Sequence, residues 1–249
     1  MGAGGGTRGS KLSFKVYIQS RMYLMTHAGR LPFLKSQPMA RRTKEDALAT
    51  RQQLLEAAER VFAEKGVSRT SLQDIAQAAG ASRGAIYWHF KNKADLFNAM
   101  MERALLPMEQ AMQQIGHDPK QDPLQELQEA ILSPMRSIVS DDRTRLVFEV
   151  ATLKIEYVDE LLAIKARHVQ AYADGLREIH RSLIGAASRR GLRLPMPPAV
   201  AAQGLQALMA GLIHTWLLAP QAFELVPVAE ASIEAYLAGL GFKPCNATA

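Results

Sequence analysis

Residues 70–93, TSLQDIAQAAGASRGAIYWHFKNK, constrain the fold most, because they predict two short helices separated by one tight turn. Ser71 and Asp74 have the spacing of a capping box at the start of the first helix. Gly80 suits a turn in which the backbone takes a left-handed conformation. The apolar positions of the first helix recur at helical spacing and predict its buried face: Leu72, Ile75, Ala76 and Ala79.

The second helix of this unit combines a small apolar edge with an unusual polar and aromatic face. Ser82 is its expected N-cap, and Ile86 and Phe90 form an i, i+4 pair that faces the first helix. An alternative for its aromatic residues is simple packing into a core. Two helices joined at a glycine turn indicate a helix-turn-helix over residues 71–90. Five residues remain outside the apolar edge: Arg83, Gly84, Tyr87, Trp88 and His89.

The segment SRGAIYWHFKNKADLF resembles the recognition helix and the following helix start of TetR-type repressors. The wider match begins with MARRTKEDALATR at Met39 and runs to about Pro107, and it resembles the AcrR-like branch that controls multidrug efflux pumps. Beyond that point the similarity is loose. The resemblance implies an all-α fold, with an N-terminal three-helix domain that contains the helix-turn-helix and a C-terminal helical bundle for ligand binding and dimerisation.

The resemblance divides the chain into three segments. Residues 39–93 are the expected DNA-binding domain, and residues 94–245 are the expected ligand-binding and dimerisation domain. Residues 1–38 hold six basic and no acidic side chains, residues 39–93 ten and six, and residues 94–249 fourteen and eighteen. The first segment is a disordered basic tail, or is not translated because translation starts at Met39, or is a basic arm that reaches DNA or an acidic membrane surface.

Apolar periodicity predicts helices along most of the chain and no sheet. Pro107 predicts a kink or an end in the helix that starts near Lys93. The apolar run at 204–218 is short for a membrane span and is interrupted by polar residues, so we expect no membrane insertion. The expected helices cover about 43–65, 93–114, 124–139, 142–156, 158–190, 199–218 and 228–240.

By resemblance, two subunits form a homodimer whose recognition helices enter successive major grooves of a palindromic double-stranded DNA operator, about 34 Å apart. The Arg83 guanidinium matches O6 and N7 of guanine, and Gly84 allows close approach of the backbone. Ser71 and Lys93 would hold phosphates. The complete set of expected DNA contacts is Ser71, Arg83, Gly84, Tyr87, Trp88, His89 and Lys93.

The family binds effectors beside the long helix that follows the recognition helix. Methionine is abundant there, and a methionine-rich lining suits a site for small lipophilic effectors. Each of these side chains could equally be ordinary core. The expected lining is Met100, Met101, Leu105, Phe148, Thr152, Met209 and His214.

Catalytic and metal functions find little support. No nucleophile elbow, glycine-rich phosphate loop or paired Cys/His spacing is present, so we expect no enzyme activity, no metal and no cofactor. The single Cys245 allows no disulfide within one chain and favours the cytoplasm. The alternatives are a TetR-type regulator of another operon, metabolic or activating, and a DNA-binding protein without a sensor function. Operator, regulated gene and effector do not follow from the sequence.

Overall fold

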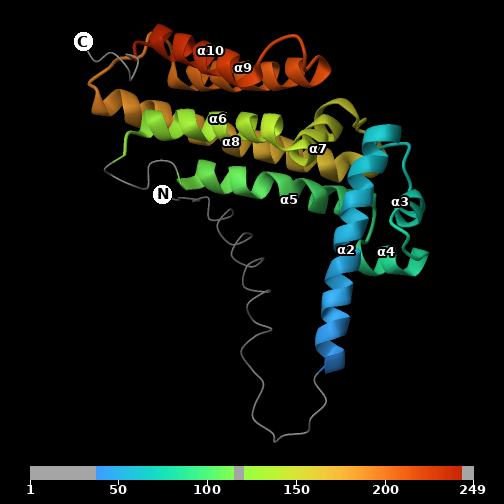
Figure 1. Cartoon of the computed structure of the whole chain (residues 1–249). Helices are drawn as coiled ribbons and strands as arrows, with labels where there is room; N and C mark the ends of the chain where they lie inside the picture. The colour runs from blue at the N-terminus through green and yellow to red at the C-terminus, as the bar shows by residue number, and fades with distance from the viewer. Residues whose placement is uncertain (1–37, 115–120, 243–249) are drawn as a thin grey trace, which may run out of the picture. The chain divides into compact units, whose positions relative to one another are not determined.

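The computed structural model of the chain describes residues 38–114 and 121–242, with side chains from residue 44 onward except 106–109 and 111–114. The extension 1–37, residues 115–120 and the C-terminal residues 243–249, including Cys245, lie outside the described residues. Helices account for all regular structure in the described part of the chain, which confirms the all-α prediction (Figure 1).

The helix order follows the sequence-based expectation closely. The structure differs from the expectation at Pro107 and at the start of α8. α5 continues through Pro107 instead of ending there, and α8 is preceded by the short 3-10 helix η2 instead of starting at Val158. The elements are α2 (Pro38–Lys65), α3 (Leu72–Ala78), α4 (Arg83–His89), α5 (Lys93–Gln114), α6 (Pro123–Ser140), α7 (Asp142–Leu153), η2 (Asp159–Leu161), α8 (Leu162–Arg189), α9 (Pro198–Leu218) and α10 (Leu225–Gly239).

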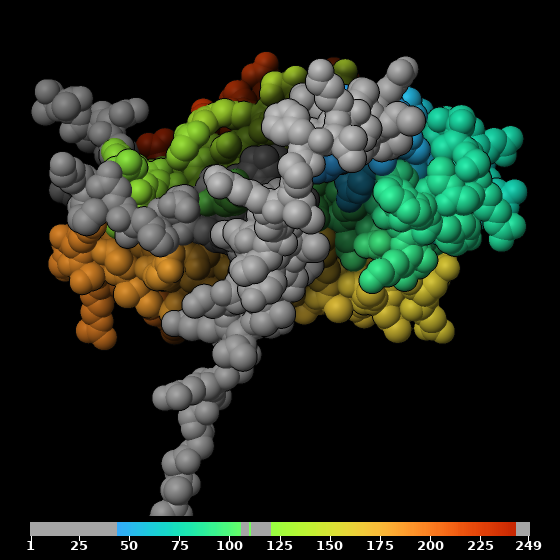
Figure 2. All heavy atoms as spheres, turned by 90° about the horizontal axis from the view of Figure 1, so that it is seen from below, coloured from blue at the N-terminus to red at the C-terminus, as the bar shows by residue number. Residues whose placement is uncertain are grey.

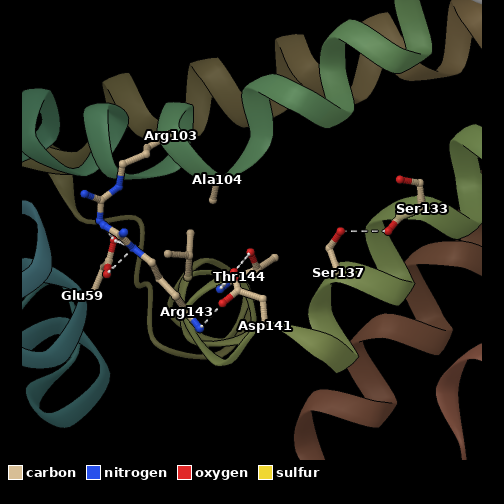
Figure 3. A pocket seen from close by; sticks show the side chains of 9 residues that line it. Glu59, Arg103, Ala104, Ser133, Ser137, Asp141, Arg143 and Thr144 are labelled. Atoms are coloured by element: carbon tan, nitrogen blue, oxygen red, sulfur yellow. Dashed lines mark hydrogen bonds and ion pairs between the residues drawn. The ribbon is translucent and has the colours of Figure 1, made fainter.

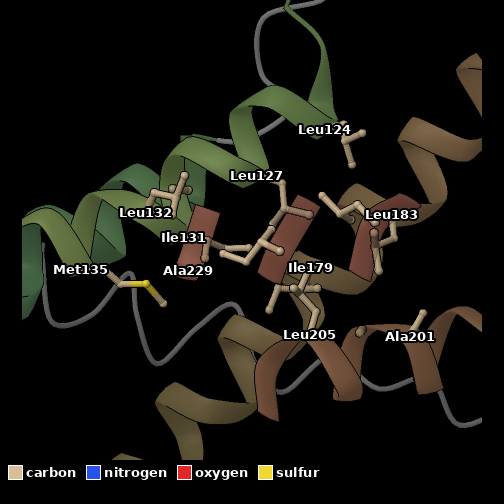
Figure 4. Packing of buried hydrophobic residues seen from close by; sticks show 14 of the residues in the cluster. Leu124, Leu127, Ile131, Leu132, Met135, Ile179, Leu183, Ala201, Leu205 and Ala229 are labelled. Carbon is tan, nitrogen blue, oxygen red and sulfur yellow. The ribbon is translucent and has the colours of Figure 1, made fainter. Parts of the chain in front are cut away.

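Buried apolar residues form two cores. The first, called here the N-terminal core, joins α2, α3, α4 and the start of α5 to parts of α7, η2 and α8. Its largest fully buried side chains include Phe62, Phe90 and Phe97. The second, called the bundle core, joins α6, the second half of α8, α9 and α10 (Figure 4). Leu127, Ile131 and Leu205 are completely buried within it.

α7 contributes to both cores because its apolar residues lie on two sides of the helix. Val147 and Val150 are buried in the N-terminal core, whereas Phe148 and Leu153 pack against the bundle core. Asp141 caps the N-terminus of α7 by accepting hydrogen bonds from the backbone N–H groups of residues 143 and 144. The twelve-residue helix α7 therefore packs against the N-terminal core on one side and against the bundle core on the other.

Gly204 marks a close approach of α9 and α10. A Cβ atom at this position would lie 3.1 Å from Cζ of Tyr236 and closer still to its hydroxyl oxygen. That hydroxyl donates a hydrogen bond of 2.8 Å to the carbonyl of Ala201. The glycine is required here because the tyrosine occupies the space that a side chain would need.

We expect Gly204→Ala to destabilise the protein by about 1–3 kcal/mol, since the added methyl group must displace Tyr236. Gly239→Ala is the matched control, because a Cβ at Gly239 meets no atom within 4 Å. Chemical denaturation followed by circular dichroism measures both. Equal stability of the Gly204→Ala variant and the parent protein would contradict the packing described.

Candidate nucleic-acid interface

α3 and α4 form the predicted helix-turn-helix, and each helix starts at a side-chain cap. The Ser71 hydroxyl accepts a hydrogen bond from the Asp74 N–H, and the Asp74 carboxylate accepts one from the Ser71 N–H, which completes the capping box. Ser82 caps α4 by accepting from the N–H of Ala85 at 3.1 Å. Gly80 has φ of +65°, so it provides the left-handed turn that the sequence predicted.

The orientation of α4 follows from its buried edge. Ile86 and Phe90 are 0 % and 1 % exposed and join the N-terminal core, as the i, i+4 pattern predicted. The opposite face carries Tyr87 and Trp88, with 52 % and 73 % of their surface exposed. Packing into a core therefore does not account for these two aromatic residues. Figure 2 shows atoms of the 71–90 segment, in teal, at the molecular surface.

Arg83 and Gly84 occupy the first turn of α4 and are exposed. The Arg83 guanidinium carbon lies 5.8 Å from the centre of the Tyr87 ring, in cation–π range. A Cβ added at Gly84 would meet only the Ser82 hydroxyl, at 3.9 Å. The fold itself therefore imposes no need for glycine at position 84.

His89 is half-buried at the end of α4. Its ring meets the Trp88 ring edge-on at 4.5 Å between centroids. Burial, followed by the nearby Arg51 charge, lowers the pKa of His89 below its usual 6.5. The imidazole is thus mostly neutral at neutral pH, with one N–H donor and one acceptor nitrogen. Arg51 itself lies over the Phe90 ring, 5.2 Å from its centre.

Lys93, the expected phosphate ligand at the start of α5, is engaged within the protein. Its ammonium group donates to the carbonyl of Ser68 at 2.9 Å and pairs with Glu160 at 2.5 Å, leaving 11 % of the side chain exposed. A phosphate contact by Lys93 stays a prediction, and it requires either the remaining N–H of the ammonium or release from Glu160.

The seven expected effector contacts lie in different places. Met100 and Met101 are buried in the N-terminal core, and Leu105 packs against it. Phe148 and Met209 pack against the bundle core. Thr152 is half-buried on α7, while His214 is exposed on α9. The residues that pack in a core thus divide between the two cores, and the assignment of the seven to an effector site stays a prediction.

A pocket of about 300 Å³ lies elsewhere, among α2, α5, α6 and α7 (Figure 3). Sequence reasoning missed its charged residues, although Glu59 interrupts the apolar stripe of α2 between Leu55 and Phe62, which was a usable signal. Seven of its nine lining residues are polar or charged, and none of the expected effector contacts lines it. Its lining consists of Glu59, Arg103, Ala104, Ser133, Ser137, Asp141, Arg143, Thr144 and Val147.

Within residues 38–114 and 121–242, no cluster of three or more histidine, cysteine, aspartate or glutamate side chains could hold a metal ion. In the same ranges, every helix is either too short or too polar to cross a membrane.

Comparisons with known proteins agree with this geometry. Residues 54–100 match the model of bacterial regulatory proteins of the tetR family, and residues 122–242 match the C-terminal region of MAATS-type transcriptional repressors. The chain is 36 % identical over 206 residues to the HTH-type transcriptional regulator TtgR of Pseudomonas putida, covering 83 % of this chain and 98 % of TtgR.

Two solved structures have the same fold. One is NalD, the secondary repressor of the MexAB-OprM multidrug efflux pump in Pseudomonas aeruginosa, with a TM-score of 0.71 and 36 % identity over 79 % of this chain and 98 % of NalD. The other is the complex of SmeT with triclosan, with a TM-score of 0.69 and 30 % identity over 81 % and 98 % of the two chains. SmeT is the repressor of the Stenotrophomonas maltophilia efflux pump SmeDEF.

An all-α chain with two capped helices, a glycine turn and an exposed aromatic face on the second helix is a helix-turn-helix DNA-binding protein. The match to TtgR, which covers most of both chains, identifies the family within this class of DNA-binding proteins. The chain belongs to the TetR family of bacterial transcriptional regulators.

The capping box gives a prediction for pH. Hydrogen bonds from the Ser71 hydroxyl and backbone N–H, followed by Lys65, lower the pKa of Asp74 from 3.8 to about 2. Ser71→Ala should therefore raise this pKa towards 3.8, as measured by carboxyl-carbon NMR. Because the folded-state pKa is depressed, the stabilisation by Asp74 is complete above pH 3.8 and is lost as the pH falls towards 2. An unchanged pKa in the variant would contradict the assigned cap.

Gly84→Ala separates folding from DNA recognition. The added methyl group meets only the Ser82 hydroxyl, at an ordinary contact distance of 3.9 Å, so stability should be unchanged or raised by up to about 1 kcal/mol. Operator affinity should fall, because the methyl group stands on the face that would approach DNA. Gly185→Ala in α8, where a Cβ meets no atom within 4 Å, is the control and should leave affinity unaltered. Thermal melts and fluorescence anisotropy of labelled DNA test both variants, and full affinity of Gly84→Ala would refute the close approach.

Proposed function

We propose that this protein is a homodimeric, cytoplasmic repressor of a multidrug efflux pump operon and that small lipophilic effectors release it from DNA. Regulation, and not catalysis, is the proposed activity. The observation that carries the proposal is the outward face of α4, where Tyr87 and Trp88 are exposed. Relatives that cover most of the chain support it, since NalD and SmeT are described as efflux pump repressors.

In this proposal residues 39–93 read DNA and residues 94–245 bind the effector and form the dimer. Arg83 contacts a guanine edge, because its guanidinium is exposed at the start of α4. Tyr87, Trp88 and His89 contact phosphate, sugar or thymine methyl groups, and Gly84 admits the backbone. Ser71 and Lys93 hold phosphates on either side and thereby set the register of the helix.

The proposed dimer surface lies on α9 and α10. Both helices are apolar on nearly every side, yet part of each remains exposed in the single chain. On α9, Val200 and Leu218 are 55 % and 62 % exposed, and small residues such as Ala207 lie between them. Val228 on α10 is also exposed, at 36 %. Pairing these faces with their copies about a two-fold axis would bury this surface and bring two α4 helices to one palindromic operator.

The effector proposal rests on apolar contacts beside α7. Phe148 on α7 and Met209 on α9 are partly exposed where they pack against the bundle core. A ligand in contact with Phe148 would act on a helix that also enters the N-terminal core through Val147. Release from DNA then follows only to the extent that the ligand binds the released state more tightly. The complex of SmeT with triclosan suggests a suitable class of ligand.

The decisive experiment measures anisotropy of a labelled duplex from the promoter of the neighbouring transporter genes. Arg83→Ala should weaken binding by about 1–3 kcal/mol and relax specificity at one base pair. Arg177→Ala, an exposed arginine on α8, is the control and should retain the parent affinity. Addition of lipophilic antimicrobials, with triclosan among them, should release the DNA from the parent protein.

Two results would refute the proposal separately. Full affinity and specificity of Arg83→Ala would remove the assigned DNA contact. If no compound releases the duplex and calorimetry finds no binding to the free protein, the sensor function fails while DNA binding stands.

A further inference from the structure

A buried carboxylate joins the DNA-reading helices to the rest of the protein. Glu59 lies on α2 with 5 % of its side chain exposed, and it is the only charged residue among those described that is buried. Arg103 of α5 donates to one carboxylate oxygen, and Nε of Arg143 on α7 donates to both oxygens at 3.1 and 3.2 Å. One side chain thus holds three helices, and Figure 3 shows both guanidinium groups turned towards it.

The ion pairs of Glu59 are sensitive to the loss of either partner. Desolvation raises the pKa of Glu59 above its usual 4.5, while the Arg143 charge acts in the opposite direction. Glu56 adds a second, weaker attraction for Arg143 at 3.9 Å, and Arg60 is close enough to influence Glu59. A buried ion pair contributes little net stability, but loss of one partner leaves an uncompensated buried charge. The position of α7 relative to α2 is therefore strongly restricted by the pair.

Two further hydrogen bonds tie the C-terminal end of α7 to α2 and the loop that follows it. The N–H of Val67, just after α2, donates to the carbonyl of Lys154 at 2.9 Å, and the Ser68 hydroxyl donates to Glu156 at 3.2 Å. Together with Arg143, these contacts hold both ends of α7 to α2 and the loop that follows it. Between them, Val147 and Val150 fill the N-terminal core.

Space for rearrangement lies next to this ion-pair cluster. The pocket of about 300 Å³ beside Arg103 and Arg143 has hydroxyl groups of Ser133, Ser137 and Thr144 in its wall. A guanidinium group that left Glu59 could enter this space and find polar neighbours there. The pocket thus leaves room beside the two arginines that a tightly packed core would not have.

We propose that Glu59 is a positioning residue that couples effector-dependent movement of α7 to the DNA-reading helices, through its simultaneous contacts with Arg103 and Arg143. The proposal rests on the DNA-binding function proposed above. Without the carboxylate, α2, α3 and α4 still fold and bind DNA, but α7 no longer responds to the binding of DNA. Linkage is reciprocal, so operator binding must also restrain α7 in the intact protein.

Hydrogen exchange of the full-length dimer with and without operator tests the coupling. The operator is a duplex selected from random-sequence DNA on the parent protein, so the test does not depend on which genes are regulated. In the parent protein, operator should slow exchange in α4 and also in α7, by about tenfold or more, within the usual range of coupling. In Glu59→Gln the protection of α4 should persist, while that of α7 should fall below about twofold.

Arg143→Gln should give the same loss of α7 protection from the other side of the contact. Glu129→Gln is the matched control, because it breaks the exposed ion pair with Arg136 on α6 and should leave α7 protection intact. A Glu59→Gln protein that is merely less stable, with operator-induced protection of α7 unchanged, overturns the proposal. Failure of both variants to fold also overturns it, since the cluster would then be needed for the fold itself.

The control measurements separate this proposal from the one on which it rests. If operator slows exchange in neither α4 nor α7 of the parent protein, the assigned DNA-reading face is wrong. If α4 is protected and α7 is not, DNA binding stands and the coupling through Glu59 fails.

Discussion

The burial of Ile86 and Phe90 determines how α4 is presented. A seven-residue helix makes only two turns, so it has one edge to offer to a core. Burying two large apolar side chains on that edge stabilises the helix by about 1.5–3 kcal/mol for each residue. Once the edge is buried, helical geometry leaves Tyr87 and Trp88 on the outer side. The exposure of these aromatic rings is thus a consequence of core packing, and the proposed DNA contacts would use it.

The N-terminal core extends well beyond the helices that surround α4. Leu161 and Ile164, from η2 and α8, are fully buried in the same cluster as Phe90 and Phe97. α3 and α4, the helices proposed to contact DNA, are consequently not attached to the bundle by a flexible connection. They share apolar contacts with it, and the carboxylate of Glu59 adds a polar contact whose cost on disruption is high.

Local sequence patterns predicted local structure well. The capping box of Ser71 and Asp74, the turn at Gly80 and the Ile86–Phe90 edge are all set by residues within a few positions of one another, and the structure has them as expected. Lys93 shows the limit of this reasoning. Its partner Glu160 lies 67 positions away, and no local pattern indicates such a pair. The position of Met100 likewise depends on how two cores divide the helices, and helical spacing alone could not show which core it enters.

The double role of α7 bears on how proteins of this kind can be recombined. The chain from 54 to 101 supplies most of the N-terminal core, but Val147, Val150, Leu161 and Ile164 complete it from much later in the sequence. A chimaera that exchanges only the first hundred residues with a relative would place foreign side chains against an unchanged α7. Exchange of DNA specificity between such repressors is thus expected to need either conservation of these four contacts or transfer of α7, η2 and the start of α8 together with the N-terminal helices. The functional unit for recombination is discontinuous in sequence, although the proposed DNA-binding surface is formed by one short continuous stretch.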